Sequence, residues 1–160
     1  MSSKVQNDAI KERKILVSGF FDPLHRGHIA YLKEAKNLGG KLVVLVHRDE
    51  CCIRKKGYCF MPLEDRMSVL KAIRYVDEVI VCGPNCDLTT CDALLKVKPA
   101  IFAKGGDRNP ENMPQCELEI CKKLGIEIVY GMGGQKVQSS SWLVENYKKR
   151  LKKDGPEIKG

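Results

Sequence analysis

The sequence predicts an α/β fold: a Rossmann-like, doubly wound sheet of five parallel strands, covered by helices, in a single domain. Three observations support this prediction. Short apolar runs of strand length alternate with segments whose apolar residues recur every three or four positions, as on one face of a helix. Glycines follow several of these runs, which is typical of chain turns. The length of 160 residues suits one domain, and right-handed crossovers favour the doubly wound arrangement.

The first part of the chain predicts a strand, a helix, a second strand and a loop. Residues 14–19 (KILVSG) are an apolar run closed by glycine, which is typical of a strand buried on both faces. Apolar positions at helical spacing predict a helix over residues 28–37, which stops at two glycines. Residues 41–47 (KLVVLVH) repeat the buried-strand pattern. Residues 48–62 have no clean period, so they predict a loop.

The same alternation continues to the end of the chain. It predicts helices over residues 63–76, 88–96 and 116–125, strands over residues 78–82, 100–107 and 126–131, and a closing helix over residues 139–151. Serines at the start of the closing helix can cap its free N–H groups. Ligands of such sheets bind beyond the carboxyl ends of the strands, so we expect the functional side chains in the loops at that edge.

Charge and composition narrow the class of protein. The net charge is +8, and residues 148–160 hold six basic and two acidic side chains. We predict a basic tail there that ends a helix in solvent, with contact to an anionic partner as the alternative. A polar extension covers residues 1–13, and the domain covers residues 14–147. No apolar run could span a membrane, no secretory signal is present, and no basic stripe is interleaved with aromatics. We therefore expect a cytoplasmic protein without a membrane or nucleic-acid partner.

Cysteines are numerous for a chain of this length. They are Cys51, Cys52, Cys59, Cys82, Cys86, Cys91, Cys116 and Cys121. No pair has the C-x-x-C spacing of zinc knuckles or redox motifs. Because no export signal is present, disulfides are disfavoured, and we interpret most of the thiols as small buried hydrophobes. A metal site formed by Cys82, Cys86 and Cys91 is the alternative.

The residues best suited to chemistry lie in the stretch GFFDPLHRGH, which begins at Gly19. Here the first strand gives way to the first helix, and two of the three histidines of the chain, His25 and His28, lie in it. Gly19 and Gly27 allow close approach of the backbone, and a helix N-terminus attracts anions. Together these features predict a polyphosphate site. The alternatives are a structural pair of histidines and a zinc site that adds His47 or a cysteine.

The same stretch resembles the G-x-F-D-x-x-H-x-G-H signature of the cytidylyltransferase-like nucleotidyltransferases. This superfamily includes heptose 1-phosphate adenylyltransferase and the cytidylyltransferases of glycerol 3-phosphate, ethanolamine phosphate and choline phosphate. Four further segments agree with the resemblance, which covers residues 14–147. RKKG resembles a mobile basic loop of the family, and LEDRMSVLKAIRYVDEVI resembles a segment with a phosphate-binding arginine. KGGD resembles a segment that lies beside nucleotide and acceptor, and SSSW resembles a serine-threonine motif.

The resemblance implies a set of site residues. Catalytic roles fall on His25, His28, Lys55, Lys56 and Arg66. Nucleotide binding falls on Gly19, Phe20, Phe21, Asp22, Gly27, Lys104, Gly105, Asp107, Ser139, Ser140 and Ser141. No metal ligand from the protein is implied. Physical chemistry favours these residue types, because phosphoryl-type transfer needs positioning and positive charge or hydrogen-bond donors around the phosphates.

The implied reaction transfers a nucleoside monophosphate from a nucleoside triphosphate, bound with Mg²⁺, to the phosphate of a small acceptor and releases pyrophosphate. KGGD and AYLKEAKNLG resemble heptose 1-phosphate adenylyltransferase, so ATP and a sugar phosphate are favoured. IRYVDEVI resembles glycerol-3-phosphate cytidylyltransferase, so CTP with a polyol phosphate such as glycerol 3-phosphate is the alternative, although Lys136 lies out of register with an arginine of those enzymes. A non-catalytic nucleotide-binding module is an alternative of another class. The resemblance also implies a homodimer.

Overall fold

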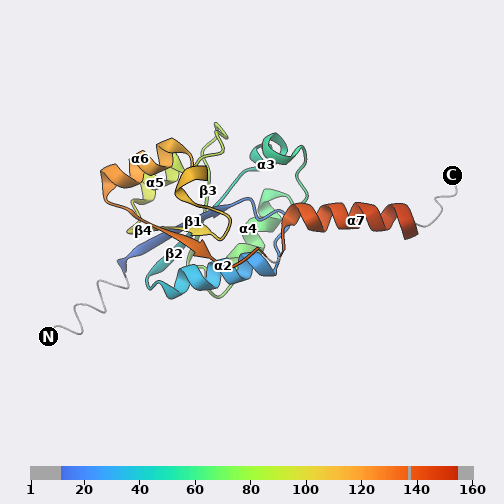
Figure 1. The fold of residues 1–160 in the computed structure, drawn as a ribbon, viewed down its shortest axis with the longest axis horizontal. Coiled ribbons are helices and arrows are strands. Elements are labelled where there is room, and N and C mark those ends of the chain that lie inside the picture. Colours follow the sequence, from blue (N-terminus) through green and yellow to red (C-terminus); the bar gives the residue numbers. More distant parts are fainter. Residues whose placement is uncertain (1–11, 137, 155–160) are drawn as a thin grey trace.

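The computed structural model describes residues 12–136 and 138–154 and contains one five-stranded sheet (Figure 1). The strands are β1 (Lys14–Gly19), β2 (Lys41–Val46), β3 (Glu78–Val81), β4 (Ile101–Gly105) and β5 (Glu127–Met132). Their order is β3-β2-β1-β4-β5, and every neighbouring pair is parallel. The chain moves outward from β1 to β3 and then crosses to β4 on the other side of β1. This reversal confirms the predicted doubly wound fold.

Helices cover both faces of the sheet. They are α2 (Arg26–Asn37), α3 (Asp49–Lys56), α4 (Leu63–Ala72), α5 (Cys91–Val97), α6 (Gln115–Leu124) and α7 (Ser140–Asp154), with a 3₁₀ helix at Pro110–Asn112. The helices α2 and α4 pack against one face, and α5 and α6 pack against the other. In Figure 1, α7 projects away from these layers.

The central strands are buried on both faces, which explains their continuous apolar sequences. Successive side chains of a strand point to opposite faces, so Ile15 of β1 joins the core beneath α2 and α4, whereas Leu16 joins the core beneath α5 and α6. The second core also holds Cys51, Cys82 and Cys121, and among the described residues the first core holds no buried cysteine. The interpretation as small buried hydrophobes is confirmed for Cys82 and Cys121, which are free thiols.

The segment after β2 is partly helical, so the prediction of a loop throughout residues 48–62 is wrong. Acidic side chains occupy the first turn of α3 and basic side chains occupy its last turn, which complements the helix dipole. Gly57 ends the helix in a left-handed conformation with φ 84°. The basic residues expected on a mobile loop therefore lie in the last turn of a helix. Only Cys51 and Cys52 of this helix are buried, so its hydrophobic period was too weak to indicate it.

The two ends of the chain lie partly outside the described residues. Residues 1–11 and 155–160 are not described, and they include most of the predicted polar extension and the end of the predicted basic tail. The helix α7 continues to Asp154 and so enters the predicted tail. Arg13, which the prediction assigns to the extension, donates hydrogen bonds to backbone carbonyls in the turn after α2.

Two disulfides correct the expectation that the cysteines remain thiols. Cys51 of α3 is bonded to Cys86, and Cys91 of α5 is bonded to Cys116 of α6, with Cα–Cα distances of 5.2 and 6.6 Å. Both distances suit a disulfide. The partners are 35 and 25 residues apart, so only the folded chain brings them together. The alternative metal site of Cys82, Cys86 and Cys91 does not form, because two of its members belong to different disulfides.

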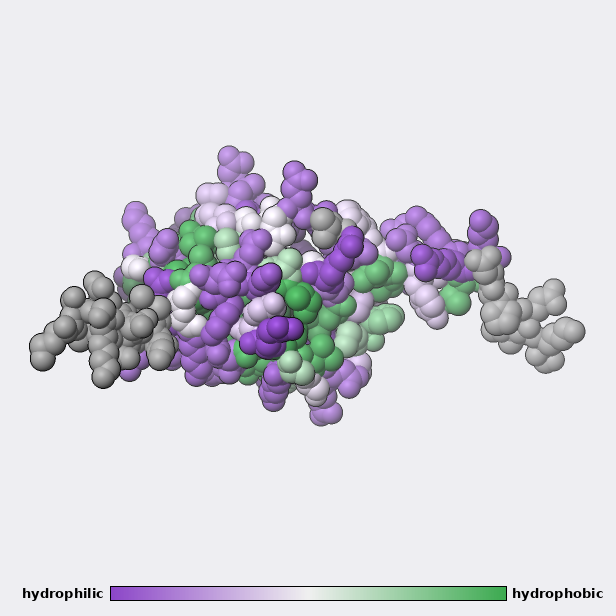
Figure 2. Space-filling model, turned by 90° about the horizontal axis from the view of Figure 1, so that it is seen from below, coloured by the Kyte–Doolittle hydropathy of each residue, from purple (hydrophilic) through white to green (hydrophobic). Residues whose placement is uncertain are grey.

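Hydrophilic side chains cover much of the face shown in Figure 2. Apolar side chains gather near the middle of the face shown in Figure 2. Ile29 of α2 and Val69 of α4 are among the large apolar side chains that remain exposed. Within residues 12–136 and 138–154, no helix combines the length and the apolar character that a membrane crossing requires.

Candidate active site

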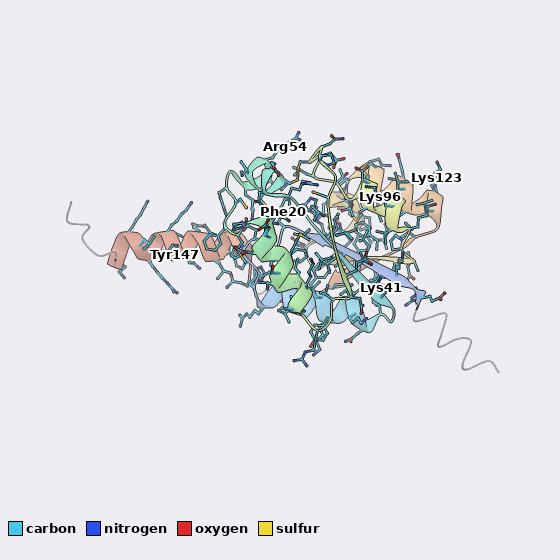
Figure 3. The ribbon with its side chains drawn as sticks, turned by 180° about the vertical axis from the view of Figure 1, so that it is seen from behind. Phe20, Lys41, Arg54, Lys96, Lys123 and Tyr147 are labelled. Carbon is cyan, nitrogen blue, oxygen red and sulfur yellow. A yellow bond between two sulfur atoms is a disulfide. The ribbon has the colours of Figure 1, made fainter. Side chains whose placement is uncertain are left out.

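A cavity of about 320 Å³ opens at the carboxyl ends of β1 and β4, the edge of the sheet where the site is predicted. Its walls also include the N-terminal ends of α2 and α7 and the segments after β4 and β5. Most of the predicted residues line it: Gly19, Phe20, Phe21, His25, Gly27, His28, Lys56, Lys104, Gly105, Asp107, Ser139 and Ser140. Figure 3 shows Phe20 within the body of the molecule, whereas Tyr147 lies out on α7.

His25 and His28 lie side by side at the start of α2. Their rings stack with centroids 3.8 Å apart and planes inclined by 25°. Nδ1 of His25 accepts a hydrogen bond from the backbone N–H of Gly27 (3.1 Å) and thereby caps the helix, and Nδ1 of His28 accepts one from the backbone N–H of His25 (3.3 Å). Because each Nδ1 is an acceptor, the neutral ring carries its proton on Nε2. Each imidazole therefore retains one Nε2–H donor.

Both imidazoles are held in the neutral form. Burial, and then repulsion from a protonated His25 and from the charge of Lys56, lower the pKa of His28 to about 3. Burial, and then the charge of Lys136, lower the pKa of His25 as well. An anion bound here would therefore meet hydrogen-bond donors and the positive end of α2 rather than two imidazolium cations.

Glycine is needed at two positions beside the histidines. A Cβ atom at Gly27 would lie 2.9 Å from Cε1 of His25, and one at Gly19 would lie 2.9 Å from Cζ of Phe21. Phe21 itself has φ 53°, which is uncommon for a residue with a side chain. Its ring packs edge-on against His28, with centroids 5.0 Å apart. The turn between β1 and α2 therefore fixes the orientation of the imidazoles.

Phe20 and His47 form an aromatic wall of the cavity. Their ring centroids are 4.6 Å apart and their planes are inclined by 24°. His47 is 5% exposed, and burial lowers its pKa to about 4. The sequence indicates His47 only as a possible zinc ligand. The signal for its place at the cavity is that it directly follows β2, a strand that neighbours β1.

Lys56 reaches the cavity, but its charge is paired with Asp22. Its Nζ atom lies 3.0 Å from Oδ2 and 2.8 Å from the backbone oxygen of Asp22. The carboxylate of Asp22 is fully buried and also accepts the backbone N–H groups of Phe60 and Met61. Burial opposes ionisation of Asp22, but these two donors and Lys56 outweigh it and lower the pKa. Asp22 thus does not line the cavity and instead ties its turn to the segment after α3.

Lys104 and Glu117 form a buried ion pair at the cavity. Nζ of Lys104 is 3.5 Å from Oε2 of Glu117, and both side chains are almost fully buried. Oε1 of Glu117 accepts the backbone N–H of Thr90 (2.8 Å), and the hydroxyl of Thr90 donates to that of Ser18 (3.2 Å). Sequence reasoning missed Ser18, Thr90 and Glu117. The available signal for Glu117 is its position one helical turn before the buried Cys121, on the inner face of α6.

The rim of the cavity carries exposed charges and the start of α7. Nζ of Lys136 lies 3.9 Å from Oδ2 of Asp107, and the neighbouring Arg108 is exposed. The hydroxyl of Ser139 accepts a backbone N–H from the first turn of α7 (3.1 Å), as predicted for a capping serine. The hydroxyl of Ser140 donates to a backbone carbonyl of the turn before α2 (2.8 Å). Arg108 was missed, although it follows the GGD segment directly.

Lys55, Arg66 and Ser141 lie outside the cavity lining. Lys55 and Ser141 are exposed, whereas Arg66 has no exposed surface. The guanidinium of Arg66 donates to the backbone carbonyls of Phe20, His47 and Met61 and to the carboxylate of Asp49. These bonds hold in place the two segments that form the aromatic wall. The placement of Arg66 favours a positioning role over the expected contact with phosphate.

The chain is similar in sequence to a known family of proteins. A sequence model described as cytidylyltransferase-like matches residues 16–152. An FAD synthase from Pyrococcus horikoshii is 42% identical over 97 residues, which cover 60% of this chain and 64% of that protein. The bifunctional protein HldE of Chromohalobacter salexigens is 41% identical over 126 residues, which cover 78% of this chain and 24% of that protein. The chain thus spans less than two thirds of the length of either relative.

A solved structure shares the fold. The lipopolysaccharide core biosynthesis protein from Thermoplasma volcanium superimposes with a TM-score of 0.61 at 31% identity, over 74% of this chain and 93% of that chain. The sequence match over residues 16–152 includes both histidines and the whole lining of the cavity. This chain therefore belongs to the cytidylyltransferase-like family.

Proposed function

We propose that the protein is a nucleotidyltransferase that transfers the adenylyl group of ATP to the phosphate of a small acceptor and releases pyrophosphate. The observation that carries this proposal is the stacked pair of neutral imidazoles at the N-terminus of α2, inside the cavity. Family membership supports the class of reaction. The name FAD synthase describes a product that contains an adenylyl group, so this similarity favours ATP over CTP.

In the proposed reaction, a phosphate oxygen of the acceptor attacks the α-phosphorus of ATP. A new Pα–O bond forms, the Pα–O bond to the β-phosphate breaks, and the electron pair leaves with pyrophosphate. The Nε2–H groups of His25 and His28 donate to the phosphate oxygens as negative charge builds up on them. Removing one preorganised donor of this kind typically lowers turnover by about 10²–10³-fold. No covalent intermediate with the protein is required.

Mg²⁺ enters with the nucleotide, as part of the substrate. Among the residues described, the groups that could hold a metal ion all include cysteine, and none is a cluster of carboxylates at the cavity. Mg²⁺ prefers oxygen ligands and commonly uses substrate phosphates and water. Lys56 and Lys104 add positive charge beside the phosphates. The carboxylates of Asp22 and Glu117 partly compensate these two charges.

FMN is the acceptor that we propose first. The similarity to an FAD synthase points to FMN, since FAD consists of FMN joined to an adenylyl group. The stacked rings of Phe20 and His47 offer a flat aromatic surface against which a planar ring can pack. A sugar phosphate such as heptose 1-phosphate, which the sequence favoured, is the second candidate, and the similarity to HldE and to a lipopolysaccharide core biosynthesis protein supports it.

Thermal unfolding with Mg²⁺ and each of ATP, CTP, GTP and UTP identifies the nucleotide before any acceptor is known. A ligand at about 100 times its dissociation constant stabilises a protein by roughly 2.7 kcal/mol, which raises the melting temperature of a domain of this size by several degrees. We expect the shift with ATP alone. A shift with CTP alone would assign the protein to the cytidylyltransferases, and no shift with any nucleotide would contradict the catalytic proposal.

Pyrophosphate release in the presence of ATP and one acceptor at a time identifies the second substrate. With FMN we expect FAD to form together with one equivalent of pyrophosphate. Heptose 1-phosphate and glycerol 3-phosphate form the other arms of the experiment. If ATP binds but none of the acceptors supports release, the acceptor proposal is wrong while the nucleotide site stands.

A further inference from the structure

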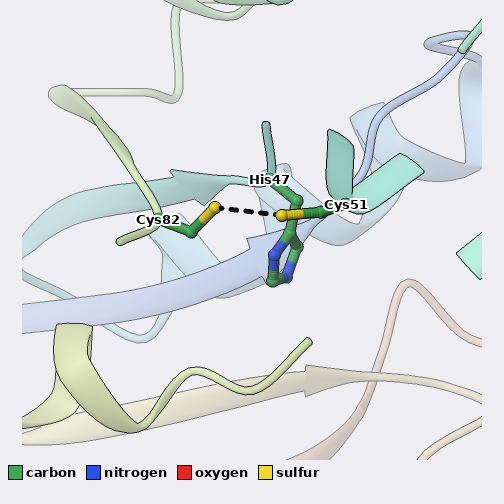
Figure 4. A group of neighbouring side chains, drawn as sticks. All are labelled: His47, Cys51 and Cys82. Carbon is green, nitrogen blue, oxygen red and sulfur yellow. Dashed lines mark hydrogen bonds between the residues drawn. The ribbon is translucent and has the colours of Figure 1, made fainter. Parts of the chain in front are cut away.

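A second group of reactive side chains lies next to the cavity and has no part in the proposed reaction. A ring nitrogen of His47 and the sulfur atoms of Cys51 and Cys82 all lie within 4.8 Å of one another (Figure 4). The two sulfur atoms are 3.5 Å apart. His47 directly follows β2, Cys51 lies on α3, and Cys82 directly follows β3. The ends of two neighbouring strands and the helix α3 therefore bring three metal-ligating atoms to one point.

The group is almost fully buried, and one ring nitrogen of His47 has no partner. The exposed fractions of His47, Cys51 and Cys82 are 5%, 0% and 8%. In the described part of the chain, Nδ1 of His47 is the one side-chain nitrogen or oxygen that is buried without a hydrogen bond. An unpaired buried polar atom is destabilising, and a bound cation would remove that penalty. The backbone N–H of Arg48 donates to Sγ of Cys82 (3.3 Å).

Cys86 can supply a fourth ligand. Its sulfur atom is bonded to that of Cys51, so reduction of this disulfide places a further thiol at the group. Three cysteines and one histidine match the ligand sets of tetrahedral structural zinc sites. The other group of potential ligands, formed by Asp22, Cys52 and Cys59, is a poorer candidate. The carboxylate of Asp22 already accepts hydrogen bonds from a lysine and from backbone N–H groups.

We propose that the reduced protein binds one Zn²⁺ ion through His47, Cys51, Cys82 and Cys86. A trialkylphosphine and one water molecule open the Cys51–Cys86 bond: the phosphine becomes its oxide, and each sulfur atom takes up one proton. Zn²⁺ then displaces the protons of the three thiols into solvent, and the neutral imidazole binds through its free lone pair. The same side chains thus hold either a disulfide or a metal ion.

The position of this site links it to the cavity. Cys51 lies on α3, the helix that also carries Lys56, and the ring of His47 stacks on Phe20. The disulfide joins α3 only to the segment after β3. A metal ion would join both of these elements to the end of β2 as well. Metal binding would therefore hold the aromatic wall of the cavity, formed by Phe20 and His47, in place.

Co²⁺ is the spectroscopic probe for this site, because thiolate ligands give it a charge-transfer absorption band. The full-length protein, reduced with the phosphine under anaerobic conditions, should bind one equivalent of Co²⁺ with this band, and Zn²⁺ should abolish the band by displacement. Protein that has not been reduced should show no band. Cys82→Ser should remove the band. Cys121→Ser, which removes another buried free cysteine, and Cys116→Ser, which removes a cysteine of the other disulfide, should retain it.

A band that persists in Cys82→Ser, or one that is absent from the reduced wild-type protein, would overturn the proposal. Circular dichroism shows whether each variant folds. A second measurement needs no variant: alkylation of the reduced wild-type protein followed by peptide mass spectrometry. Zn²⁺ should protect Cys51, Cys82 and Cys86 from alkylation but leave Cys116 reactive. Equal labelling of all four cysteines with and without Zn²⁺ would also overturn the site.

Discussion

His25 uses one ring nitrogen to cap its own helix and presents the other to the cavity. The spacing of His25, Gly27 and His28 could be read from the sequence, and it predicts a ligand site at a helix start. The tautomer could not be predicted, because it follows from the backbone N–H groups that each Nδ1 accepts. The need for glycine at position 27 is likewise a matter of local geometry, since a Cβ atom there would collide with the ring of His25.

His25→Ala should lower turnover far more than it lowers stability. Loss of one Nε2–H donor should reduce the turnover number by about 10²–10³-fold, whereas loss of a helix cap should cost about 1 kcal/mol of unfolding free energy. His25→Asn is the matched control, because asparagine caps helices well but lacks this donor. It should keep wild-type stability and still lose turnover in the pyrophosphate assay. Near-wild-type turnover of either variant would refute the proposed role.

The pKa of His28 makes stability depend on pH. Its folded-state pKa is about 3, below the ordinary value of 6.5. The unfolded chain therefore binds a proton as the pH falls through 6.5, whereas the folded chain does so only near pH 3. Between these values the unfolded state holds more protons, so the unfolding free energy should fall as the pH is lowered. Urea unfolding across this window should show a steeper loss for the wild type than for His28→Gln. Equal slopes would contradict a neutral, buried His28.

At the scale of elements, α4 holds the cavity wall together through Arg66. The sequence predicts the helix and its arginine, but it does not show where the guanidinium points. Its partners Phe20, His47 and Asp49 belong to three other segments, so no local pattern contains them. The same limit applies to α3. Its charges at both ends and its terminal Gly57 were visible in the sequence, but a helix with few buried residues has almost no hydrophobic period.

Arg66→Met should destabilise the fold strongly. It removes a buried cation and leaves the carbonyls of Phe20 and His47 without donors, which should cost about 3–5 kcal/mol of unfolding free energy. Arg74→Met is the control, since Arg74 is exposed just after α4 and should tolerate the change. Denaturant unfolding measures both variants. If Arg66→Met unfolds like the wild type and loses only turnover, Arg66 acts as a phosphate contact, as the sequence suggested.

At the scale of the whole molecule, the parallel sheet was the most predictable feature. Strands buried on both faces leave continuous apolar runs, so their number and boundaries could be read almost directly. Contacts between distant segments could not be read. Thr90 and Glu117 meet across two helices, and each disulfide joins residues that only the folded chain brings together. The homodimer, the cytoplasmic location and the domain boundaries stay predictions.

Removal of residues 148–160 should leave nucleotide binding intact. The cavity lining reaches α7 only at its first residue, Ser140, and the rest of the helix extends away from the sheet (Figure 1). The truncated protein should therefore show the same thermal shift with ATP and Mg²⁺ as the full chain. Ser139→Ala serves as a comparison, because it alters the cap of α7 at the cavity itself. Loss of the ATP-induced shift on truncation would make the basic tail part of the site.

The buried cysteines of the two cores all lie on one side of the sheet, beneath α5 and α6. The buried thiol of Cys52 lies outside both cores, beside Asp22 and Cys59. A thiol-directed reagent that enters the two cores would therefore damage one of them and spare the other. In a hydrogen–deuterium exchange experiment, the amides of α5 and α6 should lose protection after such treatment, while those of α2 and α4 keep theirs. The sheet would then separate a core that responds to such a reagent from a core that does not. The helix α2, which carries the two stacked histidines, packs against the unresponsive core.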